Sequence, residues 1–327
     1  MKKSLKALKL AAIMGFVAAS FLSAPVTYAA EKTLAVTAIV EHPALDAVYK
    51  GLLDGLAKLG YKVGENLSVQ YQTAQGDIPT TVQIANKFIG AQPDVIVGIS
   101  TPSAQAIIAK APKDQAVVFT AVTDPVGAKL VSNLLKPGAN VTGTSDMSPI
   151  KKHLELIKSV VPNAKKVGVL YNPGEANSVT LLEALEREAP ALGLTIVKAG
   201  ANNSGAVLSS ARSLVGKADV IYVPTDNTIV SAFEAVVKVG IDGQIPVFAG
   251  DTDSVKRGAA AALGFNYYDV GRQTAQLVAK IFEGAKPGDL AVELPTIVEL
   301  FVNPAAAKKM GLTIPESVIS SAKHVIK

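Results

Sequence analysis

Short apolar runs alternate with longer amphipathic stretches along most of this chain, and this alternation constrains its fold more than any other feature. Residues 34–40 form the first such run. Leucine and valine then recur at helical spacing over residues 45–59, before a stop at Gly60. Amphipathic helices between buried strands are typical of crossovers in parallel sheets. The chain is therefore expected to be an α/β protein, with helices on both faces of its sheets.

The same alternation predicts the remaining elements of a first half. Further strands are expected at residues 67–72, 94–99, 116–121 and 141–142. Helices are expected at residues 80–90, 103–110 and 126–135.

The pattern restarts near residue 150, which favours two similarly built lobes over one sheet. Strands are then expected at residues 165–171, 194–198, 219–223 and 245–248, with helices at 179–192, 207–215 and 228–239. The last part is predicted to hold strands at 259–265, 291–295 and 299–302, and helices at 270–283, 304–310 and 317–325. Periodicity alone does not say which lobe this last part joins.

The first 30 residues have the character of a secretory signal peptide. Four lysines precede an apolar run at residues 10–22, and small residues close the segment at Ala29 and Ala30. The run is shorter than the ~20 apolar residues that a spanning helix needs, so cleavage near Ala29 or Ala30 is expected rather than a membrane anchor. The chain has no cysteine, which excludes disulfides and a lipidated cysteine. The mature protein is expected to be free in a periplasm.

The charge of the mature chain argues against a nucleic-acid partner. The formal net charge of the whole chain is +5. Without the four lysines of the signal segment, 28 basic residues remain against 27 acidic ones, a net charge of +1. A nucleic-acid-binding protein would carry a clustered basic face, and the sequence has none.

Polar side chains follow nearly every predicted strand, at the end where open parallel sheets bind their ligands. Thr101 is predicted as a helix N-cap with Pro102 as the first helical residue, and Thr123-Asp124-Pro125 as a second helix start of that kind. The strand-end candidates for ligand binding are His42, Ser100, Thr101, Ser103, Thr123, Asp124, Glu175, Asn177, Ser178, Asp226, Asn227 and Asp251.

Two physical devices are present among these candidates. Hydroxyl groups beside free amides at a helix start can hold a carboxylate. The carboxylates of Glu175, Asp226 and Asp251 can hold an ammonium group. Together they describe a receptor for a zwitterion. The alternative is that each residue only caps a helix, which is the commoner role of any one of them alone. Their convergence at the ends of several strands favours the binding hypothesis.

Metal sites and covalent catalysis have little support in the sequence. His42, His153 and His324 are far apart and lack the spacing of metal ligands, and His153 is expected on the surface of a helix. No G-x-S-x-G elbow, phosphate loop or G-x-G-x-x-G fingerprint is present. We therefore expect a binding protein without a cofactor or metal, and not an enzyme.

Several segments, in this order and spacing, resemble the class I periplasmic substrate-binding proteins of ABC importers, in the branch that includes TrpX-type binders of aromatic amino acids. The resemblance runs over essentially the whole mature chain. The segments are residues 42–46, 101–105, 123–126, 137–143, 171–178, 224–227, 264–271 and 299–303.

The resemblance implies two doubly wound parallel-sheet lobes joined by three crossovers, near residues 145, 265 and 297. The N-terminal lobe would comprise 31–147 plus 266–296, and the C-terminal lobe 148–265 plus 297–327. It also implies a monomer that closes on its ligand by a hinge motion and docks on the permease subunits of the importer.

An amino acid, and within this branch an aromatic one, is the ligand that the resemblance implies. An aromatic ring needs an apolar slot, for which Phe265 and Tyr267 beside a crossover are candidates. A chain without tryptophan and with 5% aromatic residues has few other rings to offer. The alternative function is a ligand-binding sensor module for a membrane signalling partner on the same scaffold.

Overall fold

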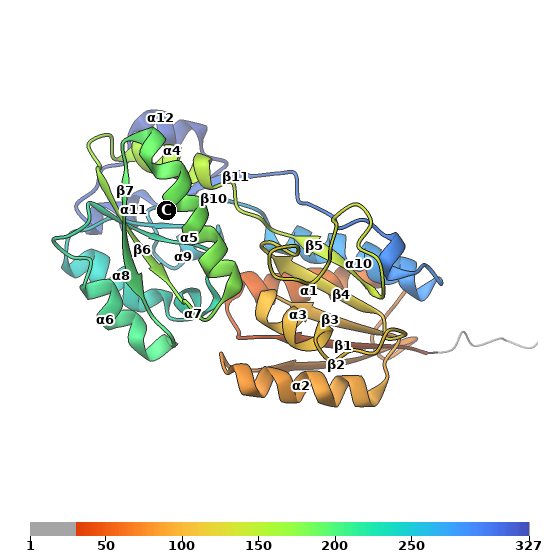
Figure 1. Cartoon of the computed structure of the whole chain (residues 1–327). Helices are drawn as coiled ribbons and strands as arrows, with labels where there is room; N and C mark the ends of the chain where they lie inside the picture. The colour runs from red at the N-terminus through yellow and green to blue at the C-terminus, as the bar shows by residue number, and fades with distance from the viewer. Residues whose placement is uncertain (1–30, 327) are drawn as a thin grey trace, which may run out of the picture. The chain divides into compact units, whose positions relative to one another are not determined.

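Two separate β-sheets organise the structure, a computed structural model that describes residues 31–326 (Figure 1). The signal segment expected at residues 1–30 lies outside this range. We call the first sheet and the helices packed on it the first lobe, and the second sheet with its helices the second lobe. Both lobes have the α/β architecture expected from the sequence.

The first sheet is entirely parallel, in the order β2-β1-β3-β4-β5. All five strands predicted in the first half of the chain are present, and the last extends three residues beyond its predicted end. The strands are β1 (Lys32–Ala38), β2 (Leu67–Thr73), β3 (Val95–Ile99), β4 (Val117–Val122) and β5 (Val141–Ser145).

The first lobe lacks the helix predicted at residues 126–135. The Asp124 carboxylate accepts hydrogen bonds from the amides of Val126 and Gly127, and Asn133 accepts from those of Leu135 and Lys136. Such local side-chain bonds compete with helix formation, so the segment is a series of turns. The helices of this lobe are α1 (Pro43–Lys58), α2 (Ile78–Ala91), α3 (Thr101–Ile108) and α10 (Tyr267–Phe282), with a 3-10 turn η3 (Pro287–Asp289).

Helices α1 and α10 pack unusually close together in the first lobe. A Cβ atom added to Gly51 would lie 2.0 Å from the carbonyl oxygen of Tyr268. One added to Gly271 would lie 2.1 Å from the carbonyl oxygen of Val48. Only glycine leaves room for this backbone contact, which joins two helices from opposite ends of the sequence.

The second sheet has the order β12-β11-β10-β9-β8-β6-β7. It departs from the parallel pattern at one place, because β11 runs antiparallel to β10. Its strands are β6 (Lys166–Tyr171), β7 (Thr195–Gly200), β8 (Val220–Val223), β9 (Val247–Ala249), β10 (Ala261–Gly264), β11 (Glu299–Val302) and β12 (His324–Val325).

Helices cover both faces of the second sheet. In β8, Val220 and Tyr222 join one apolar cluster and Ile221 and Val223 join another, as expected for alternating side chains of a strand buried on both faces. The helices are α4 (Ile150–Val160), α5 (Ala176–Glu188), α6 (Val207–Arg212), α7 (Asn227–Ser231), α8 (Phe233–Asp242), α9 (Asp253–Lys256), α11 (Pro304–Lys309) and α12 (Glu316–Ser321), with 3-10 turns η1 (Ala189–Leu192) and η2 (Ser204–Ala206).

Three further predictions for the second half need correction. The strand expected at residues 291–295 is a single bridge between Thr144 and Glu293. The helix expected at 228–239 is broken at Ala232 into α7 and α8. The helix expected at 317–325 ends at Ser321, because the following residues pair with β11 as β12.

The chain passes between the two sheets three times. It leaves the first sheet after β5, returns to the first lobe between β10 and α10, and leaves it again before β11. Helix α10 packs on α1 and on β4 of the first lobe. The lobe boundaries at 147, 265 and 296 that the resemblance implies stay a prediction.

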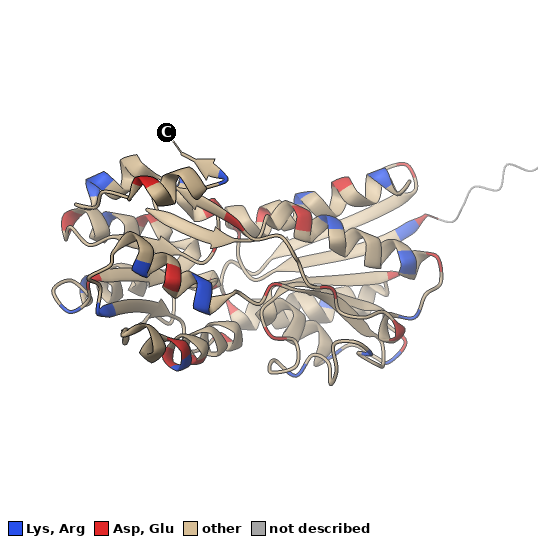
Figure 2. Cartoon of the chain, turned by 90° about the horizontal axis from the view of Figure 1, so that it is seen from above, with Lys and Arg blue, Asp and Glu red and all other residues tan. Residues whose placement is uncertain are grey.

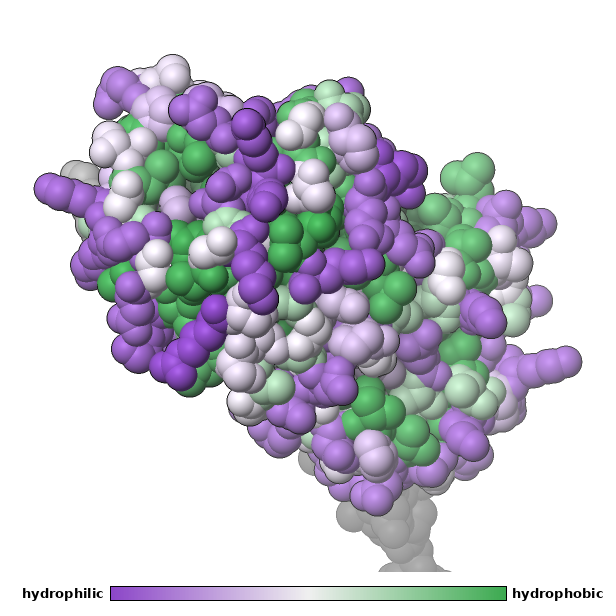
Figure 3. All heavy atoms as spheres, turned by 60° about the vertical axis from the view of Figure 1, so that its left-hand side comes forward, coloured by the Kyte–Doolittle hydropathy of each residue, from purple (hydrophilic) through white to green (hydrophobic). Residues whose placement is uncertain are grey.

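The surface is mixed in both charge and hydropathy. In the cartoon of Figure 2, acidic and basic residues are interspersed along the elements of both lobes. On the face in Figure 3, hydrophilic and hydrophobic residues are likewise intermingled. Among the helices of residues 31–326, none is both long and apolar enough to cross a membrane.

His153 is buried rather than on the surface as predicted. It is 2% exposed, and its Nδ1 lies 2.6 Å from the hydroxyl of Tyr222. Burial lowers the pKa of His153 to about 4. Helix α4 therefore presents this ring to the core of the second lobe.

Acidification is expected to destabilise the wild type more than a His153→Gln variant. Below pH 6.5 the unfolded chain takes up a proton on His153 that the folded chain does not bind until about pH 4. Stability is thus lost as the pH falls through this window. Between pH 8 and pH 5 the wild type should lose about 2 kcal/mol relative to the variant. Urea unfolding of both proteins at the two pH values measures this difference, and parallel pH profiles would contradict it.

Candidate functional site

A partly open cavity, with about 350 Å³ of space between its atoms including some open to solvent, lies where the strand ends of the two lobes meet. Residues from both lobes line it, as expected for a ligand site beyond the carboxyl ends of parallel strands. The first lobe contributes His42, Ala44, Leu45, Ser100, Ala121, Thr123, Asp146 and Tyr267. The second lobe contributes Asn177, Thr225, Asp226, Asn227, Val230 and Asp251.

Of the fourteen residues predicted for the site, eight line this cavity and six do not. The eight are His42, Ser100, Thr123, Asn177, Asp226, Asn227, Asp251 and Tyr267. The six are Thr101, Ser103, Asp124, Glu175, Ser178 and Phe265. Asp124 holds the turn described above rather than starting a helix, which corrects the prediction for Thr123-Asp124-Pro125. Phe265 faces a separate groove beside α10.

The start of α3 carries hydroxyl groups without partners. Ser100, not Thr101 as predicted, is the N-cap of α3, and its side chain makes no capping bond. Its backbone has φ 71° and ψ 161°, a conformation that costs energy for any residue but glycine and is typical of functional sites. Within residues 31–326, the buried hydroxyls of Ser100, Thr101 and Ser103 have no hydrogen-bond partner. This helix start can therefore donate to an anion.

Glu175 caps a helix rather than facing the cavity. Its carboxylate accepts hydrogen bonds from the amide and hydroxyl of Thr228, at 2.9 and 2.7 Å, and from the amide and side chain of Asn227. Asn177 donates to it as well. The carboxylate thus holds the start of α7 beside the strand end of β6, and places Asn177 and Asn227 on the cavity wall.

Asp226 is the N-cap of α7 and is completely buried. One oxygen accepts from the amide of Ile229 at 2.9 Å, and the other accepts from the amide of Asn172 and the hydroxyl of Ser178. Burial raises the pKa of Asp226, and the nearby charge of Glu175 raises it further. Ser178, which does not line the cavity, acts by holding this carboxyl group.

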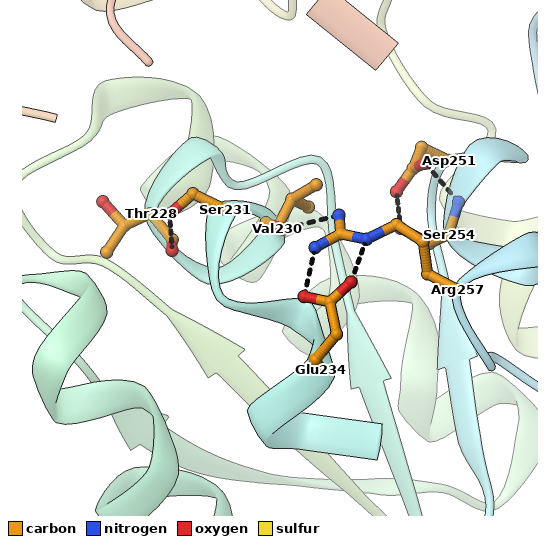
Figure 4. Close-up of polar contacts among 7 residues, drawn as sticks. All are labelled: Thr228, Val230, Ser231, Glu234, Asp251, Ser254 and Arg257. Carbon is orange, nitrogen blue, oxygen red and sulfur yellow. Dashed lines mark hydrogen bonds and ion pairs between the residues drawn. The ribbon is translucent and has the colours of Figure 1, made fainter. Parts of the chain in front are cut away.

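Asp251 is held in the same way in the turn before α9. Its two oxygens accept from the amide and the hydroxyl of Ser254, at 2.9 and 2.6 Å (Figure 4). Burial raises the pKa of Asp251. Both oxygens of this carboxyl group therefore already have a donor.

Arg257 supports the cavity wall, although nothing in the sequence pattern marked it. It binds Glu234 through two hydrogen bonds of 2.7 Å and donates a third, also 2.7 Å, to the carbonyl oxygen of Val230 (Figure 4). The hydrogen bonds from Arg257, and to a lesser degree its charge, hold the pKa of Glu234 below its ordinary value. Because Val230 lines the cavity, this pair fixes the position of α7.

Buried polar atoms without partners gather around the cavity. Five lining residues have one such atom within residues 31–326, namely His42 Nδ1, Ser100 Oγ, Asp146 Oδ1, Asn177 Oδ1 and Thr225 Oγ1. Buried polar groups are nearly always hydrogen-bonded in native proteins, so such a concentration indicates a site completed by a ligand. Both amide hydrogens of Asn177 donate within the protein, so its free oxygen is an acceptor.

Six lining residues are not among those predicted from the sequence. Asp146 directly follows β5, so a correct end for that strand would have marked it. Thr225 directly precedes Asp226 and Asn227, the two residues of that strand-end segment that were predicted for the site. The apolar ones are Ala44, Leu45, Ala121 and Val230, which resemble ordinary core residues in sequence.

His42 is an uncharged member of the site. Burial lowers its pKa to about 4, and the charge of Arg257 acts in the same direction. The imidazole is thus neutral at physiological pH and can both donate and accept one hydrogen bond. In the described part of the chain, no group of three or more His, Cys, Asp or Glu side chains could hold a metal ion.

Comparison with known proteins identifies relatives over nearly the whole described chain. The family model described as ABC transporter substrate binding protein matches residues 33–326. A tyrosine-binding protein of Clostridioides difficile is 43% identical, over 86% of this chain and 81% of that protein. The resemblance expected from the sequence is thereby confirmed, and with it the expectation of a binding protein rather than an enzyme.

Solved structures of similar proteins superpose on this chain over most of its length. A conserved domain protein from Vibrio cholerae is 50% identical and superposes with a TM-score of 0.89, over 90% of this chain and 99% of that one. An ABC domain from Streptococcus pneumoniae in complex with L-Trp is 37% identical, with a TM-score of 0.87, over 91% and 100%. A ligand-free, open substrate-binding protein with adhesive properties from Clostridium difficile is 42% identical, with a TM-score of 0.67, over 90% and 99%.

Proposed function

Since this chain belongs to the family of ABC transporter substrate-binding proteins, we propose that it captures an aromatic amino acid between its two lobes. The observation that carries the proposal is the set of five unpartnered buried polar atoms around the cavity in residues 31–326. We infer further that the protein is exported with residues 1–30 removed, and that it delivers its ligand as a monomer to the permease of an importer.

The carboxylate of the amino acid is assigned to the start of α3. The hydroxyl of Ser100 lines the cavity, and those of Thr101 and Ser103 lie in the first turn of the same helix. Hydroxyl donors and the free amides of a helix start both favour a negative charge. The strained backbone of Ser100 is consistent with a residue positioned for a ligand.

The aromatic ring is assigned to the apolar part of the lining. Ala44, Leu45 and Ala121 provide this surface from the first lobe, and Val230 from the second. The ring of Tyr267 borders the same cavity. The relatives favour a ring as the ligand side chain, because one is a tyrosine-binding protein and another is a complex with L-Trp.

Closure of the lobes about the connecting segments is part of the proposed mechanism. The chain superposes better on the L-Trp complex, at 37% identity, than on the ligand-free open structure, at 42% identity. A closer sequence with a poorer superposition is what a change in lobe arrangement would produce. A single cavity lined by residues of both lobes supports the interpretation of the structure as the closed arrangement.

Binding of L-tryptophan and L-tyrosine by the purified mature protein tests this function. The chain has no tryptophan, so the fluorescence of L-tryptophan, excited near the red edge of its absorption band, is free of indole background from the protein. We expect saturable changes in that fluorescence. Ligand at 100 times its dissociation constant should stabilise the protein by about 2.7 kcal/mol, which thermal unfolding measures.

Glycine and L-glutamate serve as controls for the ring. Both carry the zwitterionic group without an aromatic side chain, so neither should stabilise the protein at the same concentration. Equal stabilisation by all four amino acids would contradict the aromatic part of the proposal. No stabilisation by any amino acid would contradict the function as a whole.

A further inference from the structure

Asp146 is a buried carboxyl group with one oxygen bound and the other unpartnered. It is 3% exposed and lines the cavity directly after β5. Its Oδ2 accepts a hydrogen bond of 2.8 Å from the hydroxyl of Tyr267. Its Oδ1 is buried and has no hydrogen-bond partner within residues 31–326.

The other carboxyl groups at this site are used differently. Each oxygen of Glu175, Asp226 and Asp251 accepts at least one hydrogen bond from the second lobe. They fix the starts of helices α7 and α9. Asp146 alone among these four keeps an oxygen without a donor, so the four are not equivalent as partners for a cation.

A carboxylate in this position needs a positively charged partner. Burial of an ionised group without a counter-charge is costly, and the neutral form is favoured instead. Burial accordingly raises the pKa of Asp146 to about 6, against the opposing effects of the Tyr267 hydrogen bond, of its own backbone amide and of the Thr123 side chain. Within the described chain, the cavity lining contains no lysine or arginine. A cation must therefore come from the ligand.

We propose that Asp146 Oδ1 binds the α-ammonium group of the ligand, and that Tyr267 positions this carboxylate through Oδ2. The inference rests on the proposed function and specifies how it recognises an amino acid. It replaces the ammonium partners predicted from the sequence, Glu175, Asp226 and Asp251, by a residue of the first lobe. The carboxylate and ammonium groups of the ligand then both bind the first lobe, through the strand ends of β3 and β5.

The position of Asp146 links the ligand to two connecting segments. Asp146 stands where the chain leaves the first sheet, and its amide donates to the carbonyl oxygen of Val122. Tyr267 stands where the chain returns to the first lobe at the start of α10. An ammonium group on Asp146 thus contacts, directly and through Tyr267, two of the three segments about which the lobes close.

The test compares L-tyrosine with 3-(4-hydroxyphenyl)propanoate, which lacks only the amino group. Wild-type protein should prefer L-tyrosine by on the order of 100-fold in dissociation constant, because the analogue leaves Asp146 buried and unpaired. In Asp146→Asn this preference should fall to less than about 10-fold, since a neutral amide gains little from an ammonium group. Retained affinity of the variant for the analogue reports that it is folded.

Two further variants separate positioning from general disruption. Asp251→Asn should keep the wild-type preference, because both oxygens of Asp251 are held by Ser254. Tyr267→Phe removes the hydrogen bond to Oδ2, and should reduce the preference while leaving affinity for the analogue within about threefold. Isothermal titration calorimetry with both ligands gives each ratio.

The outcomes distinguish the inference from the function on which it rests. The assignment of Asp146 is overturned if both Asp146→Asn and Tyr267→Phe keep the wild-type preference for L-tyrosine over the analogue. It is also overturned if Asp251→Asn loses that preference instead. Either result leaves tyrosine binding itself intact. Failure of wild-type protein to bind L-tyrosine overturns the proposed function, and the assignment with it. Loss of the preference in Asp146→Asn, with its reduction in Tyr267→Phe, supports both.

Discussion

Alanine in place of Gly271 is expected to lower the free energy of unfolding by at least about 3 kcal/mol. The new Cβ would lie 2.1 Å from the carbonyl oxygen of Val48 and 2.8 Å from the amide nitrogen of Leu52. Both are backbone atoms of α1, so no change of rotamer can relieve the contact. Helix α10 must move, and Tyr267 at its start must move with it. Urea unfolding measures the stability, and L-tyrosine binding measures the effect on the site.

Gly90→Ala is the matched control. Gly90 lies inside α2, and an added Cβ meets nothing within 4 Å. Alanine is the better helix former, so this variant should gain about 0.5–1 kcal/mol. If both variants had similar stabilities, the close contact between α1 and α10 would not be a determinant of the fold.

Asp226→Ala is expected to cost about 4 kcal/mol of stability and to abolish ligand binding. The substitution leaves the amides of Asn172 and Ile229 and the hydroxyl of Ser178 without their buried acceptor. It also removes the cap of α7, which carries Asn227 and Val230 on the cavity wall. Urea unfolding and calorimetric titration of the same preparation give the two quantities.

Asp77→Ala separates this effect from ordinary capping. Asp77 caps α2 with a single bond of 2.7 Å to the amide of Thr80, but it is exposed and far from the cavity lining. Its loss should cost about 1 kcal/mol and leave binding unchanged. Equal losses in the free energy of unfolding of Asp226→Ala and Asp77→Ala would mean that Asp226 acts only as a helix cap.

The alternation of strands and helices was enough to predict the α/β architecture, because buried parallel strands and amphipathic crossovers have distinct periods. It failed where local bonds compete with the pattern. Residues 126–135 have helical periodicity, yet Asp124 and Asn133 fold the segment into turns. The antiparallel direction of β11 in the second sheet was also not predictable, since strand direction depends on contacts made across the whole chain.

The location of the site was predictable from the sequence, but the roles of its residues were not. Polar residues at strand ends cap helices and bind ligands with the same side chains, so Glu175 and Asp226 were indistinguishable in sequence. Burial and the direction of each hydrogen bond separate them in the structure. Asp146 was missed because the predicted strand ended at Thr142, which placed Asp146 within a loop.

The close packing of α1 on α10 at Gly51 and at Gly271 also constrains the order in which the protein can fold. Helix α1 is synthesised early, whereas its partner α10 is followed by only a 3-10 turn, two short strands and two short helices. The part of α1 that packs on α10 therefore has no native partner until most of the chain has been made. Domains that fold as units usually do so during synthesis, N-terminal part first. In this protein the first lobe is complete only after most of the second has been made, and a chain cut short before Tyr267 would lack the helix that packs on α1 and on β4.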